Sequence, residues 1–136
     1  MTAVIKVLAL DVGEKRIGVA WGDSSVKIAT PYGVIAMGET AVAEIEKLIS
    51  QLGVSRLVIG LPRNSRGEET KQSQYVRNFA KKLAVFDCPI AFQDESLTSV
   101  EAENILDKKG GKFAKSDIDS HAAAVILSDY LESRFG

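Results

Sequence analysis

The sequence has few of the residues and segments that would assign it to several common protein classes. Its single cysteine, Cys88, excludes a disulfide framework and a cysteine-based zinc site, and it favours a reducing cytoplasm. The single histidine, His121, is too little for a histidine-based mechanism, and we expect it on a helix surface. No apolar run approaches the roughly 18 residues of a membrane span, and the first ten residues lack the features of a secretory signal. We therefore expect a cytoplasmic protein with no membrane partner.

The chain also lacks an excess of charge of either sign. Its 17 basic and 18 acidic residues give a formal net charge of −1, which excludes a protein that coats nucleic acid through bulk positive charge. The positive charge is nevertheless clustered. Residues 61–82 carry six basic side chains against two acidic ones, and residues 108–117 carry four lysines against one aspartate. Each cluster indicates either a solvated surface or a local patch for nucleic acid.

The composition is that of one folded domain, which we assign to residues 1–136. Hydrophobic residues make up 46% and charged residues 26% of the chain. Apolar runs predict strands at residues 5–10, 17–21, 32–37, 56–60 and 89–92, and helical spacing predicts helices at 42–52, from the 61–67 loop to about 85, at 98–109 and at 116–132. Three antiparallel strands followed by helix–strand units imply an α/β protein with a mixed five-stranded sheet flanked by helices. This order is compatible with a ribonuclease-H-like fold.

Acidic residues recur where the predicted strands end and where the last helix begins. Asp11 ends a buried strand, where an unpaired carboxylate is costly, although an aspartate there is also typical of a turn. Asp94 and Glu95 follow the last predicted strand, and one of them is expected to be merely exposed because successive side chains point to opposite sides. Asp117 and Asp119 open the last helix, where the helix dipole favours acids without any catalysis.

These acids would become a site only if Asp11 converged with one member of each pair. Three carboxylates in one pocket repel each other, and a divalent cation removes that repulsion. Carboxylate oxygens suit Mg²⁺ or Mn²⁺, and two such ions about 4 Å apart can activate water and stabilise the leaving oxygen of a phosphodiester. The acids therefore indicate metal-dependent hydrolysis if they converge, and ordinary turn, loop and cap residues if they do not.

Four segments resemble the YqgF (RuvX-like) family, in the same order and over nearly the whole chain. They are residues 11–20 (DVGEKRIGVA), 60–67 (GLPRNSRG), 94–102 (DESLTSVEA) and 119–124 (DSHAAA). The resemblance implies a ribonuclease-H-like fold and a bacterial cytoplasmic nuclease that processes the 5′ end of pre-16S rRNA. The family has also been described as Holliday junction resolvases.

The resemblance also implies which residues form the active site. It assigns the catalytic and metal-binding triad to Asp11, Glu95 and Asp119, with Mg²⁺ or Mn²⁺ as the cofactor. Ser96 stands where the family usually has arginine. The missing guanidinium removes one phosphate or carboxylate clamp, so the detail of substrate contact changes while the triad is kept.

Basic and loop residues within these motifs are candidates for substrate binding. The candidates are Lys15, Arg16, Arg63, Asn64 and Arg66. Strand alternation points only one of the first two toward the site. The loop that contains the other three precedes a helix, so its N–H groups can hold a phosphate, with a purely structural loop as the equal alternative.

Nucleic acid is the expected partner, with precursor rRNA first and branched DNA as the alternative. Resolution of a four-way DNA junction requires paired nicks, which a twofold-symmetric dimer delivers. The sequence is compatible with a monomer or a homodimer. A nucleic-acid-binding factor without catalysis is a third alternative, and the retention of all three acids argues against it.

Overall fold

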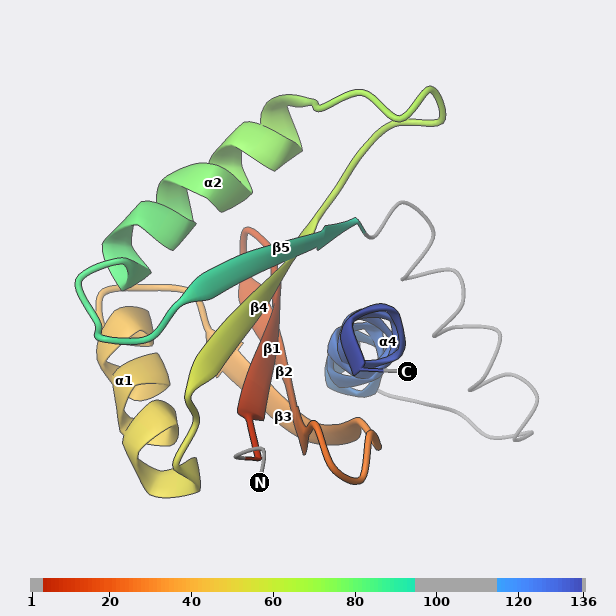
Figure 1. Cartoon of the computed structure of the whole chain (residues 1–136). Helices are drawn as coiled ribbons and strands as arrows, with labels where there is room; N and C mark the ends of the chain where they lie inside the picture. The colour runs from red at the N-terminus through yellow and green to blue at the C-terminus, as the bar shows by residue number, and fades with distance from the viewer. Residues whose placement is uncertain (1–3, 95–114, 136) are drawn as a thin grey trace.

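The computed structural model describes residues 4–94 and 115–135, which form a five-stranded sheet with helices on both faces (Figure 1). The elements are β1 (Lys6–Val12), β2 (Arg16–Asp23), β3 (Thr30–Ala36), α1 (Ala41–Leu52), β4 (Arg56–Leu61), α2 (Lys71–Leu83), β5 (Ile90–Asp94) and α4 (Lys115–Phe135). The strands lie in the order β3-β2-β1-β4-β5, so β3 and β5 form the two edges. The predicted mixed α/β sheet is confirmed.

The central strand, β1, is where the sheet changes from antiparallel to parallel pairing. It pairs antiparallel with β2, where Asp11 is opposite Gly18, and parallel with β4, where Leu10 is opposite Ile59. β4 in turn pairs parallel with β5. Because β1, β4 and β5 run in the same direction, their carboxyl ends meet at one end of the sheet, which is where ligands gather in α/β proteins.

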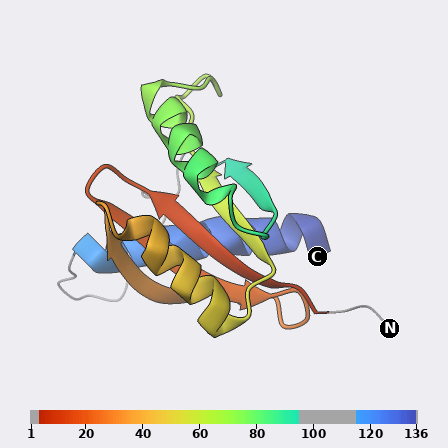
Figure 2. The same ribbon diagram turned by 90° about the vertical axis from the view of Figure 1, so that its left-hand side faces the viewer.

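Residues of β1 alternate between two separate hydrophobic cores. Leu8, Leu10 and Val12 pack in the core that α1 and α2 cover. Val7 and Ala9 pack in a second core beneath α4. Figure 2 shows α4 crossing the sheet on the face opposite to the two shorter helices. The odd-numbered side chains of β1 therefore point to the α4 face.

The helix ends are fixed by local chemistry. α1 ends at Leu52, as predicted, because the following Gly53 adopts the left-handed conformation (φ 65°) and its N–H reaches the carbonyl groups of the last turn. α2 starts with a capping box between Thr70 and Ser73, which the sequence reading did not include. The Ser73 hydroxyl also donates to the carbonyl of Pro62, so the start of α2 is tied to the loop after β4.

The first strand is longer than predicted. β1 continues through Asp11 to Val12, two residues beyond the predicted strand at 5–10, and β2 begins at Arg16, so the strand end predicted before Asp11 was wrong. The ladder with β2 extends to these residues because the Gly13 N–H closes the turn on the Arg16 carbonyl oxygen at 2.9 Å. Asp11 is consequently a strand residue with a defined facing direction.

Other boundaries shift by a few residues. β5 ends at Asp94, beyond the predicted strand end, because its ladder with β4 continues to Leu61. α4 extends to Phe135 rather than to about residue 132. The predicted helix at 98–109 lies outside the described residues. Among the helices that the structure does describe, none has the length and apolar character needed to span a membrane.

Candidate active site

Asp11 stands near the carboxyl end of the central strand, on the face that α4 covers. Its strand neighbours two and four residues earlier, Ala9 and Val7, are fully buried in the core beneath α4. Asp11 itself is half-buried and has polar or electrostatic contact within the protein. The sequence predicted a carboxylate at the mouth of the core, and the structure places it there.

Asp119 reaches the same place from the other end of the chain. The backbone of Gly18, which is opposite Asp11 in the β1–β2 ladder, lies directly against the backbone of Asp119. A Cβ built at Gly18 would overlap the Asp119 carbonyl oxygen. The glycine thus lets α4 approach the sheet closely enough to bring the two aspartates together, a close approach that only a residue without a side chain allows.

Arg16 completes this group by pairing with Asp119. Its Nε donates to Oδ2 of Asp119 at 2.7 Å, and the two side chains are 32% and 20% exposed. Arg16 precedes Gly18 by two residues in β2, so both lie on the α4 face. Lys15 is exposed in the turn, where its carbonyl accepts from the Met37 N–H. Of the two candidates, Arg16 is therefore the one beside the acids.

Asp119 is not a first-turn residue of its helix. α4 begins at Lys115, so Asp119 is the fifth helical residue and its carboxylate is engaged with Arg16. The helix-dipole interpretation, which rests on the first turn, therefore does not apply to Asp119. The side chain of Asp117 lies outside the described side chains.

Asp94, the last residue of β5, belongs to the opposite face of the sheet. Its strand neighbour Phe92 lies under the guanidinium of Arg77 from α2, at 5.0 Å from the ring centroid. Asp94 follows by two residues and accepts from Nε of Arg63 at 2.7 Å. The Asp94 carboxylate is thus on the α2 side, away from Asp11. Glu95, the predicted member of the triad, lies outside the described residues.

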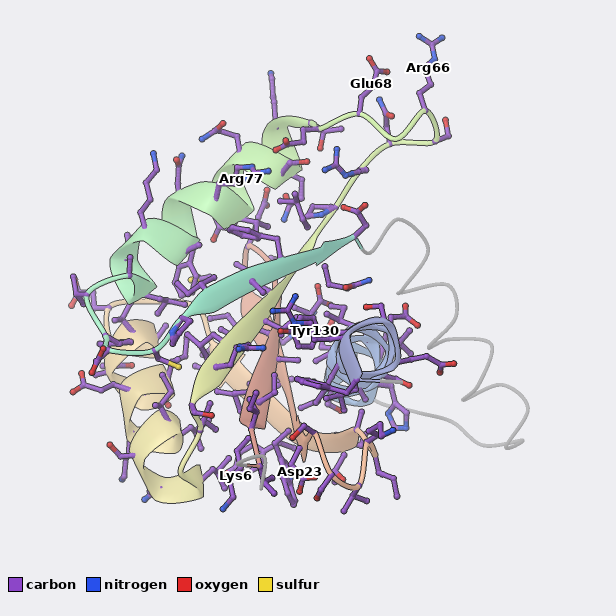
Figure 3. The ribbon with its side chains drawn as sticks, viewed as in Figure 1. Lys6, Asp23, Arg66, Glu68, Arg77 and Tyr130 are labelled. Carbon is purple, nitrogen blue, oxygen red and sulfur yellow. The ribbon has the colours of Figure 1, made fainter. Side chains whose placement is uncertain are left out.

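The loop between β4 and α2 is organised by its own side chains. Arg63 donates from Nη1 to the Gly67 carbonyl at 3.0 Å in addition to its bond with Asp94. Oδ1 of Asn64 accepts from the N–H groups of Arg66 and Glu68 at 2.9 and 3.0 Å. Arg66 and Glu68 extend from the tip of this loop (Figure 3). The side chains of Arg63 and Asn64 therefore make structural contacts, and Arg66 extends from the tip of the loop.

Two features of this region differ from what the sequence predicts. They concern His121 and Gly18. His121 is half-buried and lines a hollow between α4 and residues 27–31, rather than lying freely on a helix surface. The sequence analysis does not predict the second feature, which is that Gly18 lets α4 pack closely on the sheet. The signal available in the sequence was a glycine inside an otherwise apolar strand, which often marks the close approach of another backbone.

The arrangement offers two hard oxygen ligands on one face. Asp11 and Asp119 both adjoin Gly18 there, and the Arg16 guanidinium is bonded to Asp119. Within residues 4–94 and 115–135, no group of three histidine, cysteine or acidic side chains is close enough to hold a metal ion. The third predicted ligand, Glu95, directly follows the end of β5.

Comparisons with known proteins agree over almost the whole chain. A family model described as "RuvX: Holliday junction resolvase" matches residues 5–133. A protein of Chloroflexus aurantiacus named "Putative pre-16S rRNA nuclease" is 47% identical over 133 residues, which cover 94% of this chain and 87% of the relative. A protein of the same name from Synechocystis is 39% identical over 139 residues, covering 98% and 91%.

Solved structures are similar in fold at much lower identity. RuvC of T. thermophilus, in complex with a Holliday junction substrate, superposes with a TM-score of 0.60 at 15% identity and covers 96% of this chain and 95% of its own. The fowlpox virus resolvase with its substrate Holliday junction DNA gives 0.58 at 8% identity, covering 97% and 100%. At such identities the likeness concerns the fold alone, and it confirms the predicted ribonuclease-H-like fold.

Proposed function

Because the chain belongs to the RuvX family of nucleases, we propose that it cleaves precursor 16S rRNA at its 5′ end, using a divalent cation held by Asp11, Glu95 and Asp119. The observation that carries the proposal is the close packing of α4 against Gly18, which brings two of these acids to one face of the sheet. The curated relatives bear the name of pre-16S rRNA nucleases, which gives the substrate class. Two neighbouring carboxylates would repel the phosphates of a bound nucleic acid, so a protein that only binds phosphates has no use for them.

Glu95 is favoured over Asp94 as the third acid because Asp94 has another partner. Asp94 is already committed to Arg63 on the α2 side. Of the two adjacent acids, this leaves Glu95 for the triad, which is the assignment that the family resemblance implies.

Mg²⁺ or Mn²⁺ fits the chemistry of this donor set. The acids present carboxylate oxygens, which are hard ligands. Such a cation, when bound, would stabilise the charge that develops on the phosphate during hydrolysis. Asp11 and Asp119 would hold the cation together with Glu95. Arg16, already bonded to Asp119, positions that carboxylate and supplies positive charge beside the substrate phosphate.

The remaining candidates divide between direct and indirect contact with substrate. Arg66 and Lys15 are exposed and free to reach phosphates that flank the cut. Arg63 and Asn64 act mainly by holding the loop that presents Arg66. Phosphate contacts of this kind give affinity with little base specificity. We further propose that residues 1–136 form one nuclease domain, that the protein works in the cytoplasm, and that it acts as a monomer or homodimer.

The test is cleavage of a pre-16S 5′-leader RNA by the pure protein, with Mn²⁺ or Mg²⁺ and with EDTA. We expect cleavage only with the cation, and we expect Asp11→Asn to abolish it while the thermal unfolding midpoint stays close to that of the wild type. Asp129→Asn, which removes an exposed acid farther along α4, serves as the control and should cleave normally. Full activity of Asp11→Asn, in a preparation free of contaminating nuclease, would refute the assignment.

Cleavage of four-way DNA junctions is the second candidate, and the description of the matching family model favours it. The same acids would serve both reactions, so the substrates must be compared directly. Paired nicking of a four-way junction, with no cut in the leader RNA under identical conditions, would replace the first candidate with the second. Binding without a cut in either substrate would support a non-catalytic factor.

A further inference from the structure

A second feature of the α4 face is a groove at the outer edge of the sheet. It has a volume of about 500 Å³ and runs between edge strand β5 and the C-terminal part of α4. Its polar lining comes from Arg56, Gln93, Tyr130, Ser133 and Arg134. None of these residues belongs to the four segments that resemble the family, although Gln93 directly precedes one of them.

The charge of the groove is positive and is not neutralised within the described residues. In the described part of the chain, three arginines are paired with acids: Arg16 with Asp119, Arg63 with Asp94 and Arg77 with Glu69. Arg56 and Arg134 belong to no such pair there, and no described residue that lines the groove is acidic. Two guanidinium groups that share one hollow without a carboxylate are suited to an external anion.

One of these arginines is held in place before any ligand arrives. Nη1 of Arg56 donates to the hydroxyl of Tyr130 at 2.9 Å. Tyr130 is only 6% exposed, and it extends from α4 toward the sheet (Figure 3). The bond uses one N–H of a group that has five, so the remaining donors are available to the groove. Preorganisation of this kind lowers the entropic cost of binding.

The groove starts beside the proposed active site and leads away from it. In the parallel ladder, Leu10 is opposite Ile59 and Ile59 is opposite Phe92, so Gln93 is level with Asp11 two strands away. At about 4.8 Å per strand this is about 10 Å. The far end, at Arg134, is 15 residues along α4 from Asp119, or about 22 Å at 1.5 Å per residue.

We propose that this groove binds the phosphates of the RNA strand that extends from the cleavage site, with Arg56 and Arg134 as the two phosphate contacts. The inference rests on the proposed function and adds a distal binding site to it. At about 3.4 Å per stacked nucleotide, 22 Å corresponds to roughly six nucleotides. The groove therefore distinguishes substrates by length and has no effect on an RNA that ends within a few nucleotides of the cut.

The experiment measures RNA binding by the Asp11→Asn protein, so that cleavage does not interfere. Arg56→Gln and Arg134→Gln are added to it singly and together. Lys47→Gln is the matched control, because it removes one positive charge from α1 on the opposite face. The probes are leader RNAs that extend two or ten nucleotides beyond the cut, on the 5′ side or on the 3′ side.

We expect each groove variant to bind one of the two ten-nucleotide extensions about fivefold more weakly, and the two-nucleotide RNAs unchanged. The slope of log affinity against log salt should fall by about 0.7 for each lost contact. The Lys47→Gln control should leave both quantities unchanged. In the cleaving protein, the same arginine variants should raise KM for the long RNA and leave kcat as it is.

Equal losses for short and long RNAs, no loss at all, or an equal loss in Lys47→Gln would each overturn the groove assignment. These outcomes are distinct from failure of the proposed function. If the wild-type protein cleaves the leader RNA but the arginine variants bind like the parent, only the groove assignment fails. If the wild-type protein cleaves no RNA, the proposed function fails whatever the groove binds.

Discussion

Gly18 is the residue on which the position of α4 depends. Any side chain there meets the backbone of Asp119, which belongs to a long helix and cannot move aside locally. We therefore predict that Gly18→Ala destabilises the fold by about 1–3 kcal/mol and lowers nuclease activity more than stability alone would require. Gly38→Ala is the control, since a Cβ at Gly38 has no neighbour within 4 Å. Denaturant unfolding and cleavage assays of both variants test this prediction. Wild-type stability and wild-type activity in Gly18→Ala would contradict it.

Cys88 offers a second residue-scale prediction. It is 6% exposed, and its pKa is raised by burial and, to a lesser extent, by the nearby Asp87. Since only the thiolate reacts, alkylation by iodoacetamide near pH 8.5 should be at least about tenfold slower in the folded protein than in urea. A raised pKa also means that this thiol's contribution to stability is complete below the unfolded pKa and is lost as the pH rises through the folded value. Alkylation of the folded protein as fast as in urea would contradict this prediction, because it would show that Cys88 is accessible.

At the scale of elements, the loop between β4 and α2 is attached to β5 by the pair of Arg63 and Asp94. The pair is partly exposed, so its contribution to overall stability is small, and its effect is to hold the loop in place. We predict that Asp94→Asn leaves the unfolding midpoint nearly unchanged, raises amide hydrogen exchange in residues 62–67 and raises KM severalfold.

The reversed pair provides the control for this prediction. Arg63→Asp combined with Asp94→Arg should recover part of the exchange protection that each single change loses. A lack of recovery would mean that the two side chains act independently. A loss of kcat in Asp94→Asn, with KM unchanged, would instead indicate a direct catalytic contribution from Asp94.

The elements themselves were largely predictable from the sequence, because hydrophobic periodicity reports which faces are buried. All five described strands and the three described helices were expected, and the end of α1 at Leu52 was predicted correctly. The boundary at Asp11 was wrong because an Asp-x-Gly sequence suits a turn as well as a strand end, and the ladder with β2 decided between them. Pair partners such as Arg16 and Asp119, which are separated by 103 positions, depend on tertiary packing that no local pattern encodes.

At the scale of the whole molecule, the sheet separates two kinds of surface. The α4 face carries Asp11, Asp119 and the arginine groove, whereas α1 and α2 enclose the larger apolar core on the other face. A cation that binds only the folded protein stabilises it by mass action. We predict that Mn²⁺ at about a hundredfold excess over its Kd raises the Tm by roughly 9 °C, and that EDTA reverses the rise.

Variants of the proposed cation ligands test whether the rise in Tm comes from this site. Asp11→Asn and Asp119→Asn should lose the Mn²⁺-dependent rise in Tm, because each removes a carboxylate from the proposed cation site. Gln replacing Glu44, an exposed acid in the first turn of α1, should keep it. An equal rise in all four proteins would mean that the cation binds elsewhere or without specificity.

The ion pair between Arg16 and Asp119 also bears on how the protein is made. Ribosomes release a chain from its amino end, so Asp11, Arg16 and the whole sheet emerge before the helix that carries Asp119. Until that last segment has left the exit tunnel, the nascent chain has an incomplete set of acids. If the cation site requires Asp119, as proposed, a nuclease built in this order would stay inactive toward the messenger and the ribosomal RNA that surround it during its own synthesis.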